Sequence, residues 1–126
     1  MNTLQTVGPL VGRILIALIF IMAGWNKIAG SGRPTLAIAA VVAIVVELGG
    51  GLLIAAGYKA RWAAAALFLF TATTALVFHN FWAMPAEQAQ NQMIHFMKNL
   101  AIMGGLLYVV VHGSGPLSAE RATSRA

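Results

Sequence analysis

Four long runs of apolar residues dominate this sequence and restrict the folds that it can adopt. The runs cover approximately residues 10–29, 35–56, 61–82 and 93–112. A helix of about 20 residues crosses the ~30 Å hydrocarbon core of a bilayer once, so each run is long enough for one crossing. A helix also bonds its backbone groups internally, which the water-free core requires. The sequence therefore predicts an all-α fold, a bundle of four transmembrane helices.

The composition excludes most other classes of protein. The chain has 126 residues, of which 60% are hydrophobic and 9% are charged, whereas soluble domains carry about 25% charged residues. Four crossings use nearly the whole length, which leaves no room for a soluble catalytic domain. The sequence contains no cysteine, so disulfides, thiolate nucleophiles and cysteine-held iron–sulfur clusters are excluded. We expect no independent catalytic activity and no metal site.

The charged residues indicate the orientation in the membrane. The net charge of +5 comes from basic residues that stand singly or in pairs at the ends of the apolar runs, which argues against a nucleic-acid partner. Five basic residues fall on the side of the termini, and three fall on the other side: Arg13, Lys59, Arg61, Arg121 and Arg125 against Lys27, Arg33 and Lys98. The positive-inside rule therefore predicts that both termini are cytoplasmic. Residues 1–8 form a short cytoplasmic segment in this interpretation, 9–112 the membrane domain, and 113–126 a disordered tail.

Glu47 lies near the middle of the second apolar run, where an unpaired charge costs about 2.5–3.5 kcal/mol. It could exchange protons or bind the polar head of a ligand, or it could form an ion pair that only fixes helix packing. Arg13 and Lys27 share one face of the first helix with small residues, so both are candidate partners. We expect Arg13 to be the partner, because a guanidinium binds a carboxylate through two bonds, and Lys27 to extend toward the interface.

A polar stripe crosses the fourth predicted helix, which we expect to begin near Pro85 and to extend beyond its apolar run. Its members recur every three or four residues: Gln88, Gln92, His95 and Asn99. Lys98 lies beside the stripe, and His79 lies at a similar depth in the third run. The cluster could form the mouth of a pocket or a proton path, or a self-satisfied interface. Haem ligation by His79 and His95 is not favoured, since no other haem signature is present.

Several segments resemble the DoxX family of small bacterial inner-membrane proteins, and its YphA-like subgroup in particular. The similar segments are residues 12–27, 46–51, 57–61 and 79–100. The resemblance implies a multi-pass protein of the bacterial inner membrane, with a role beside membrane oxidoreductases such as thiosulfate:quinone oxidoreductase. It also implies importance for the matching positions, Arg13, Lys27, Glu47, Arg61, His79, His95 and Lys98. One departure from the family is the short connection between the first two helices.

Three hypotheses follow from the sequence. The first is an accessory membrane subunit of an oxidoreductase, with a pocket for a quinone or another lipophilic ligand. The second is a small proton-coupled transporter, which would need a homo-oligomer to enclose a path. The third is a structural membrane scaffold. The candidate site for all three comprises Arg13, Lys27, Glu47, His79, Gln92, His95, Lys98 and Asn99. The partners that we expect are the lipid bilayer, a second copy of the chain and an oxidoreductase subunit.

Overall fold

The computed structural model describes residues 1–29 and 38–124, and this part of the chain consists of helices joined by short turns. Four of its helical segments are long and apolar enough to cross a membrane, as the sequence predicted. In chain order the elements are α1 (Thr3–Ala29), α2 (Ile38–Ile44), the π-helical turn η1 (Val45–Gly49), α3 (Gly50–Ala56), α4 (Ala60–Phe78), the 3₁₀ turn η2 (Phe81–Ala83), α5 (Ala86–His112) and α6 (Ala119–Ser124).

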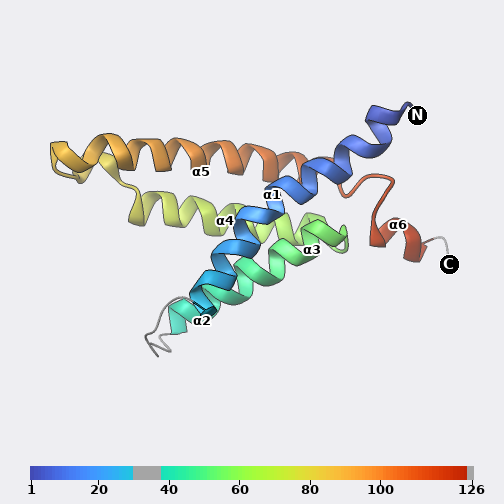
Figure 1. Cartoon of the computed structure of the whole chain (residues 1–126), viewed down its shortest axis with the longest axis horizontal. Coiled ribbons are helices and arrows are strands. Elements are labelled where there is room, and N and C mark those ends of the chain that lie inside the picture. The colour runs from blue at the N-terminus through green and yellow to red at the C-terminus, as the bar shows by residue number, and fades with distance from the viewer. Residues whose placement is uncertain (30–37, 125–126) are drawn as a thin grey trace.

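The four spans form two antiparallel pairs that cross each other (Figure 1). α1 packs along α3 and η1, and α4 packs along α5, while α3 joins the two pairs by contacting α4. Both termini lie at one end of the molecule, which we call the terminal end, as four crossings require (Figure 1). That this end faces the cytoplasm stays a prediction from the charge distribution.

α1 begins earlier than expected, so residues 3–8 belong to the first helix and do not form a separate segment. The Asn2 side chain accepts a hydrogen bond from the Gln5 backbone N–H at 2.8 Å, and the Gln5 side chain accepts one from the Asn2 backbone N–H at 3.0 Å. This reciprocal pair is a capping box, which satisfies the free donors of the first turn. The helix then continues through Pro9. The polarity of residues 1–8 concealed this start.

Glycines set the close approach of the first pair of helices. A Cβ atom on Gly24 would lie 2.8 Å from the Leu48 Cβ, and one on Gly51 would lie 3.3 Å from the Ala17 carbonyl oxygen. Gly50 faces Leu67 of α4 in the same way. Small residues near Glu47 therefore let the helices approach each other closely.

The second span is interrupted at its centre by a π-helical turn, which the sequence did not predict. η1 replaces the α-helical bonds around Glu47 with one wider turn, and α3 then continues to the left-handed cap at Gly57 (φ 74°). Such π turns accommodate one additional residue and occur often at functional sites. The expected start of this span, residues 35–37, lies outside the described residues.

The tail after His112 was expected to be disordered, yet its described part packs against the terminal end. Ser114 is buried, and its hydroxyl donates a hydrogen bond to the Glu120 carboxylate at 2.7 Å. The Glu120 backbone N–H donates to the Gly57 carbonyl oxygen at 3.1 Å. Polar composition suggested disorder here, but these polar groups find partners within the tail and at the C-terminal cap of α3.

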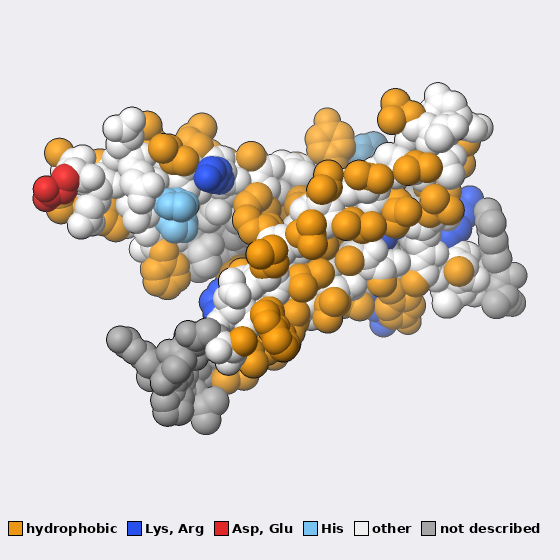
Figure 2. All heavy atoms as spheres, viewed as in Figure 1, with side chains coloured by type: hydrophobic (Ala, Val, Ile, Leu, Met, Phe, Trp, Pro, Cys, Tyr) orange, Lys and Arg blue, Asp and Glu red, His pale blue; other side chains and the backbone are white. Residues whose placement is uncertain are grey.

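The outer surface is largely apolar. Hydrophobic side chains cover the middle of the face in Figure 2, and charged side chains lie toward its ends. The buried core is small by comparison and consists of Ala17, Phe20, Ile54, Ala63, Ala64, Leu67 and Leu106. A surface of this kind is suited to contact with lipid chains, because in water it would far exceed the apolar patch of an ordinary soluble protein.

Candidate functional site

The acidic residue in the middle of the second span forms an ion pair with Lys27. The Lys27 Nζ lies 2.6 Å from the Glu47 Oε1. The Glu47 side chain is 5% exposed and the Lys27 side chain is 43% exposed. Among the described residues, the structure records this bond to Oε1 and none to Oε2. The pair therefore keeps hydrogen-bonding capacity on both partners.

Arg13 was expected to pair with Glu47, and this expectation is wrong. Its guanidinium is buried and binds the end of α3: Nη1 donates to the carbonyl oxygens of Ile54 and Ala55, each at 3.0 Å, and Nη2 donates to that of Leu117. The last carbonyls of a helix have no partner within it, so they attract a nearby cation. Arg13 is a structural residue of the terminal end.

The periodicity of α1 was predicted correctly. Its buried residues are Arg13, Ala17, Phe20 and Gly24, the face that the sequence indicated for Arg13 and Lys27. The same face brings Phe20 and Lys27 to one wall of a cavity that we call the central pocket.

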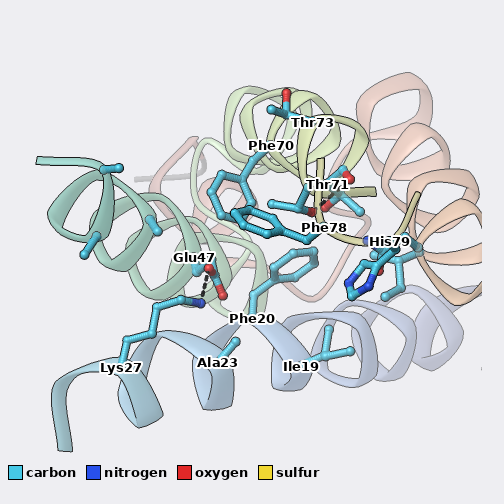
Figure 3. Close-up of a pocket in the computed structure, with 16 residues that line it drawn as sticks. Ile19, Phe20, Ala23, Lys27, Glu47, Phe70, Thr71, Thr73, Phe78 and His79 are labelled. Atoms are coloured by element: carbon cyan, nitrogen blue, oxygen red, sulfur yellow. Dashed lines mark hydrogen bonds and ion pairs between the residues drawn. The ribbon is translucent and has the colours of Figure 1, made fainter. Parts of the chain in front are cut away.

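The central pocket has a volume of about 590 Å³ and is bounded by α1, α2, η1, α4 and one edge of α5. Phenylalanines form much of its wall, and the Lys27–Glu47 pair lies at one side (Figure 3). Figure 3 also shows Phe70, Thr71 and Phe78 extending from α4 toward the side that carries Phe20. The other polar side chains that line the pocket include Thr73, Thr74, His79 and Asn99. This combination of apolar walls with few polar groups is typical of a site for a lipophilic small molecule.

Thr71 is a buried polar residue of this pocket whose hydroxyl has no recorded hydrogen-bond partner in the described part of the chain. Thr73 and Thr74 bond their hydroxyls to backbone carbonyls of their own helix, at 2.9 and 3.0 Å. The Thr71 side chain is buried, and its Oγ1 has no hydrogen-bond partner within the described ranges. A buried hydroxyl without a partner costs about 1–3 kcal/mol. Thr71 was not among the residues predicted for the site, although its spacing from Thr74 and Phe78 places the three on one helix face.

The polar stripe of α5 divides in the structure. Gln92 and His95 meet His79: the Gln92 Oε1 lies 2.8 Å from the His79 Nδ1, and the two imidazole rings stack with centroids 5.2 Å apart. Asn99 lines the central pocket with His79. Gln88 is exposed, and Lys98 lies on the outer surface among Met93, Ile94 and Met97, so neither reaches the site.

The two histidines do not have the geometry of axial haem ligands. Their rings stack at an angle of 26°, whereas two axial ligands approach one iron from opposite sides through their nitrogens. Within the described residues, no group of three His, Asp or Glu side chains could hold a metal ion. The arrangement instead offers hydrogen-bonding groups beside an apolar cavity.

Comparison with known proteins identifies the family. The sequence profile of the SURF4 family matches residues 2–124. This chain belongs to the SURF4 family. The resemblance to the DoxX family is therefore wrong. Small residues between packed helices and long aliphatic runs recur in many membrane proteins, so they did not discriminate between the two families.

The relatives within the SURF4 family include two from Escherichia coli. The chain is 38% identical to the inner membrane protein YqjF over 99% of its own length and 98% of that protein, and 33% identical to the inner membrane protein YphA over 89% and 87%. It is also 30% identical to a Surfeit locus protein 4 homolog of Schizosaccharomyces pombe, but there it covers 37% of the longer protein. No solved structure matches the chain. The prediction of a multi-pass inner-membrane protein agrees with the bacterial names and with the four spanning helices.

Proposed function

We propose that this SURF4-family membrane protein binds a lipophilic ligand with a polar head in the central pocket. The observation that carries the proposal is the Thr71 hydroxyl, which is buried in the wall of a cavity of about 590 Å³ and has no partner among the described residues. In this proposal the Thr71 O–H turns toward the cavity, and an acceptor oxygen of the ligand satisfies it. The walls supply apolar contact for the remainder of the molecule.

The ion pair supports the same proposal. Beyond the bond between them, Lys27 has two N–H donors and Glu47 has a carboxylate oxygen without a recorded partner in the described ranges, so the pair offers both donors and an acceptor to a polar head. A carbonyl-bearing amphiphile would accept from Thr71 or Lys27, and a hydroxyl-bearing one would also donate to Glu47. The ligand class is thus a neutral amphiphile with at least one oxygen at its head.

The first test replaces Thr71 with Val, which keeps the shape of the side chain and removes the hydroxyl. We expect the affinity for a decyl-substituted benzoquinone to fall about fivefold, since one hydrogen bond contributes about 1 kcal/mol. The stability of the ligand-free protein should not fall, because an unsatisfied donor is removed. Calorimetric titration in detergent measures the affinity, and thermal unfolding measures the stability.

Thr73→Val is the matched control, because the Thr73 hydroxyl lines the same pocket but bonds to the Leu69 carbonyl of its own helix. Its effect on affinity should be small. Decylbenzene, which has the same chain and no oxygen, tests the need for a polar head. If neither compound binds and no amphiphile is found by mass spectrometry in the purified protein, the proposal is wrong.

The quinone result also bears on the expected role beside an oxidoreductase. That role was inferred from the DoxX resemblance, and without this resemblance its support is the fit between a quinone and the pocket. The quinone is proposed as a cofactor of a partner enzyme that this chain would serve as an accessory subunit. Recovery of native quinone with the protein from bacterial membranes would support the role, and recovery of another amphiphile would argue against it.

A second candidate function is proton-coupled transport, which the position of Glu47 favours. This carboxylate is 5% exposed, lies in a widened helical turn, and has one cationic partner. We expect Glu47→Gln to abolish proton uptake into proteoliposomes if the chain, as a homo-oligomer, moves protons with a substrate. Uptake that is absent in the wild-type protein, or equal in both, would contradict the transport hypothesis. A scaffold would show neither uptake nor ligand binding.

A further inference from the structure

A second cavity lies between α1 and α5, nearer the terminal end than the central pocket. This α1–α5 groove has a volume of about 710 Å³, and its floor and walls include Gly12, Ile16, Ile102, Gly105 and Val109. α1 and α5 cross at an angle (Figure 1) and touch each other over a short stretch. Leu15 and Tyr108 at its rim are largely exposed, so the groove opens at the surface of the bundle. Its apolar interior faces the part of the bilayer where acyl chains lie.

Basic side chains gather where this groove reaches the terminal end. Arg13 and His112 line it, and the Arg61 guanidinium packs against Gly113, where a Cβ atom would lie 2.9 Å from the Arg61 Nε. Arg13 is 2% exposed, and its Nε has no hydrogen-bond partner in residues 1–29 and 38–124. The carbonyl groups that Arg13 binds are neutral, so its charge is not cancelled by an ion pair within 4 Å in this part of the chain.

The acidic residues do not neutralise this end. The chain contains three acids: Glu47 pairs with Lys27 in the middle of the bundle, and Glu87 begins α5 at the far end. Glu120 is the one at the terminal end, where it accepts a hydrogen bond from Ser114 and attracts Arg13 electrostatically. It is one acid against the basic residues Arg13, Lys59 and Arg61, so the groove joins an apolar cavity to a region of excess positive charge at the terminal end.

We propose that the α1–α5 groove binds one anionic phospholipid from the leaflet on the side of the termini. One acyl chain lies in the groove against Ile16 and Ile102, and the phosphate lies toward Arg61 and His112. The charge complementarity selects this occupant, since a zwitterionic lipid would bring a second cation to a region that is already positive. The groove shares Ile102 with the central pocket, but its proposed occupant does not depend on the function proposed for that pocket.

Two adjacent glycines of α5 provide a matched test. Gly105 lies in the groove, where a Cβ atom would lie 2.8 Å from the flexible end of Ile16, whereas Gly104 has no atom within 4 Å of its Cβ position. Gly105→Leu should fill the groove, and Gly104→Leu should add the same side chain on the open face. We expect native mass spectrometry of the full chain to show phosphatidylglycerol on the wild type and on Gly104→Leu, and little or none on Gly105→Leu.

A second pair of variants tests the charge and remains informative if Gly105→Leu does not fold. Arg61→Gln should weaken phosphatidylglycerol binding about fivefold, the value of one basic residue near a lipid headgroup. Lys59→Gln removes a charge from the same turn, away from the groove, and should leave binding nearly unchanged. Thr71→Val should also leave it unchanged.

Three results would overturn the proposal. The first is equal retention of phosphatidylglycerol and of phosphatidylcholine with the same acyl chains. The second is equal retention by Arg61→Gln and Lys59→Gln, which would indicate that surface charge in general attracts the lipid. The third is a homodimer without bound lipid that Gly105→Leu disrupts, because the groove would then be an interface between two copies of the chain.

Discussion

Replacing Lys27 with Met is expected to lower the free energy of unfolding by about 3 kcal/mol, because the Glu47 carboxylate would remain in the bundle without a cation. Glu47 is 5% exposed and has Lys27 as its recorded ionic partner in the described chain. Neutralising or hydrating the stranded carboxylate would widen the central pocket around η1. Thermal unfolding in detergent, followed by circular dichroism, measures the loss.

The double variant Lys27→Met/Glu47→Leu distinguishes a mutual interaction from two independent effects. It should recover most of the lost stability, since a pair of apolar side chains can replace a buried ion pair at little cost. Glu47→Leu alone should cost less than Lys27→Met, because Lys27 is 43% exposed and can extend to the interface. Lys98→Met, on the outer surface of α5, is the control. If the double variant is as unstable as the sum of the two single variants, the ion pair does not stabilise the bundle.

Length and periodicity were sufficient to predict the fold. The four apolar runs gave four spanning helices, because the thickness of the bilayer fixes the length of each helix. The buried face of α1 followed from the 3.6-residue repeat that Arg13, Ala17, Phe20 and Gly24 share. These features depend on local geometry, so they can be predicted without knowledge of the tertiary contacts.

The partner of Glu47 could not be predicted in the same way. Arg13 and Lys27 were both candidate bases for one carboxylate, and the guanidinium was the expected partner. In the structure Arg13 instead binds carbonyl oxygens at the end of α3, which no sequence pattern marks as acceptors for it. Whether Arg13 reaches the Glu47 carboxylate or the carbonyls at the end of α3 depends on how far α1 and α3 overlap. The packing of Gly24 against Leu48 sets this overlap.

The central pocket illustrates a second limit of sequence reasoning. His79, Gln92, His95 and Asn99 were predicted as a polar cluster from their spacing, and the structure brings them to or near the pocket. No comparable sequence pattern predicts the π turn at Glu47. The turn replaces α-helical backbone hydrogen bonds with π-helical ones inside one long apolar run. Thr71 differs from Thr73 and Thr74 in that its hydroxyl has no hydrogen-bond partner among the described residues. This difference can be seen only in the coordinates.

Replacing Arg13 with Gln is expected to have the largest effect on the terminal end, a loss of about 4 kcal/mol in the free energy of unfolding. Hydrogen bonds from a charged donor contribute about 1.5–3 kcal/mol each, and Arg13 donates to three carbonyl oxygens, those of Ile54, Ala55 and Leu117. The loss is smaller than their sum because water can reach some of the freed carbonyls. Thermal unfolding in detergent gives the magnitude.

The same variant should also release the tail, since Arg13 bonds both the end of α3 and Leu117. Trypsin should then cut faster after Arg121 in the Arg13→Gln variant than in the wild type, which mass spectrometry of the fragments can follow. Arg13→Lys should restore only part of the stability, because an ammonium group lacks the planar fork that reaches carbonyls on two segments. Lys59→Gln, which removes a charge from the neighbouring turn, should leave stability and cleavage nearly unchanged. Equal behaviour of Arg13→Gln and Lys59→Gln would mean that the guanidinium contributes general positive charge at this end, and that other contacts hold residues 113–124 against α3.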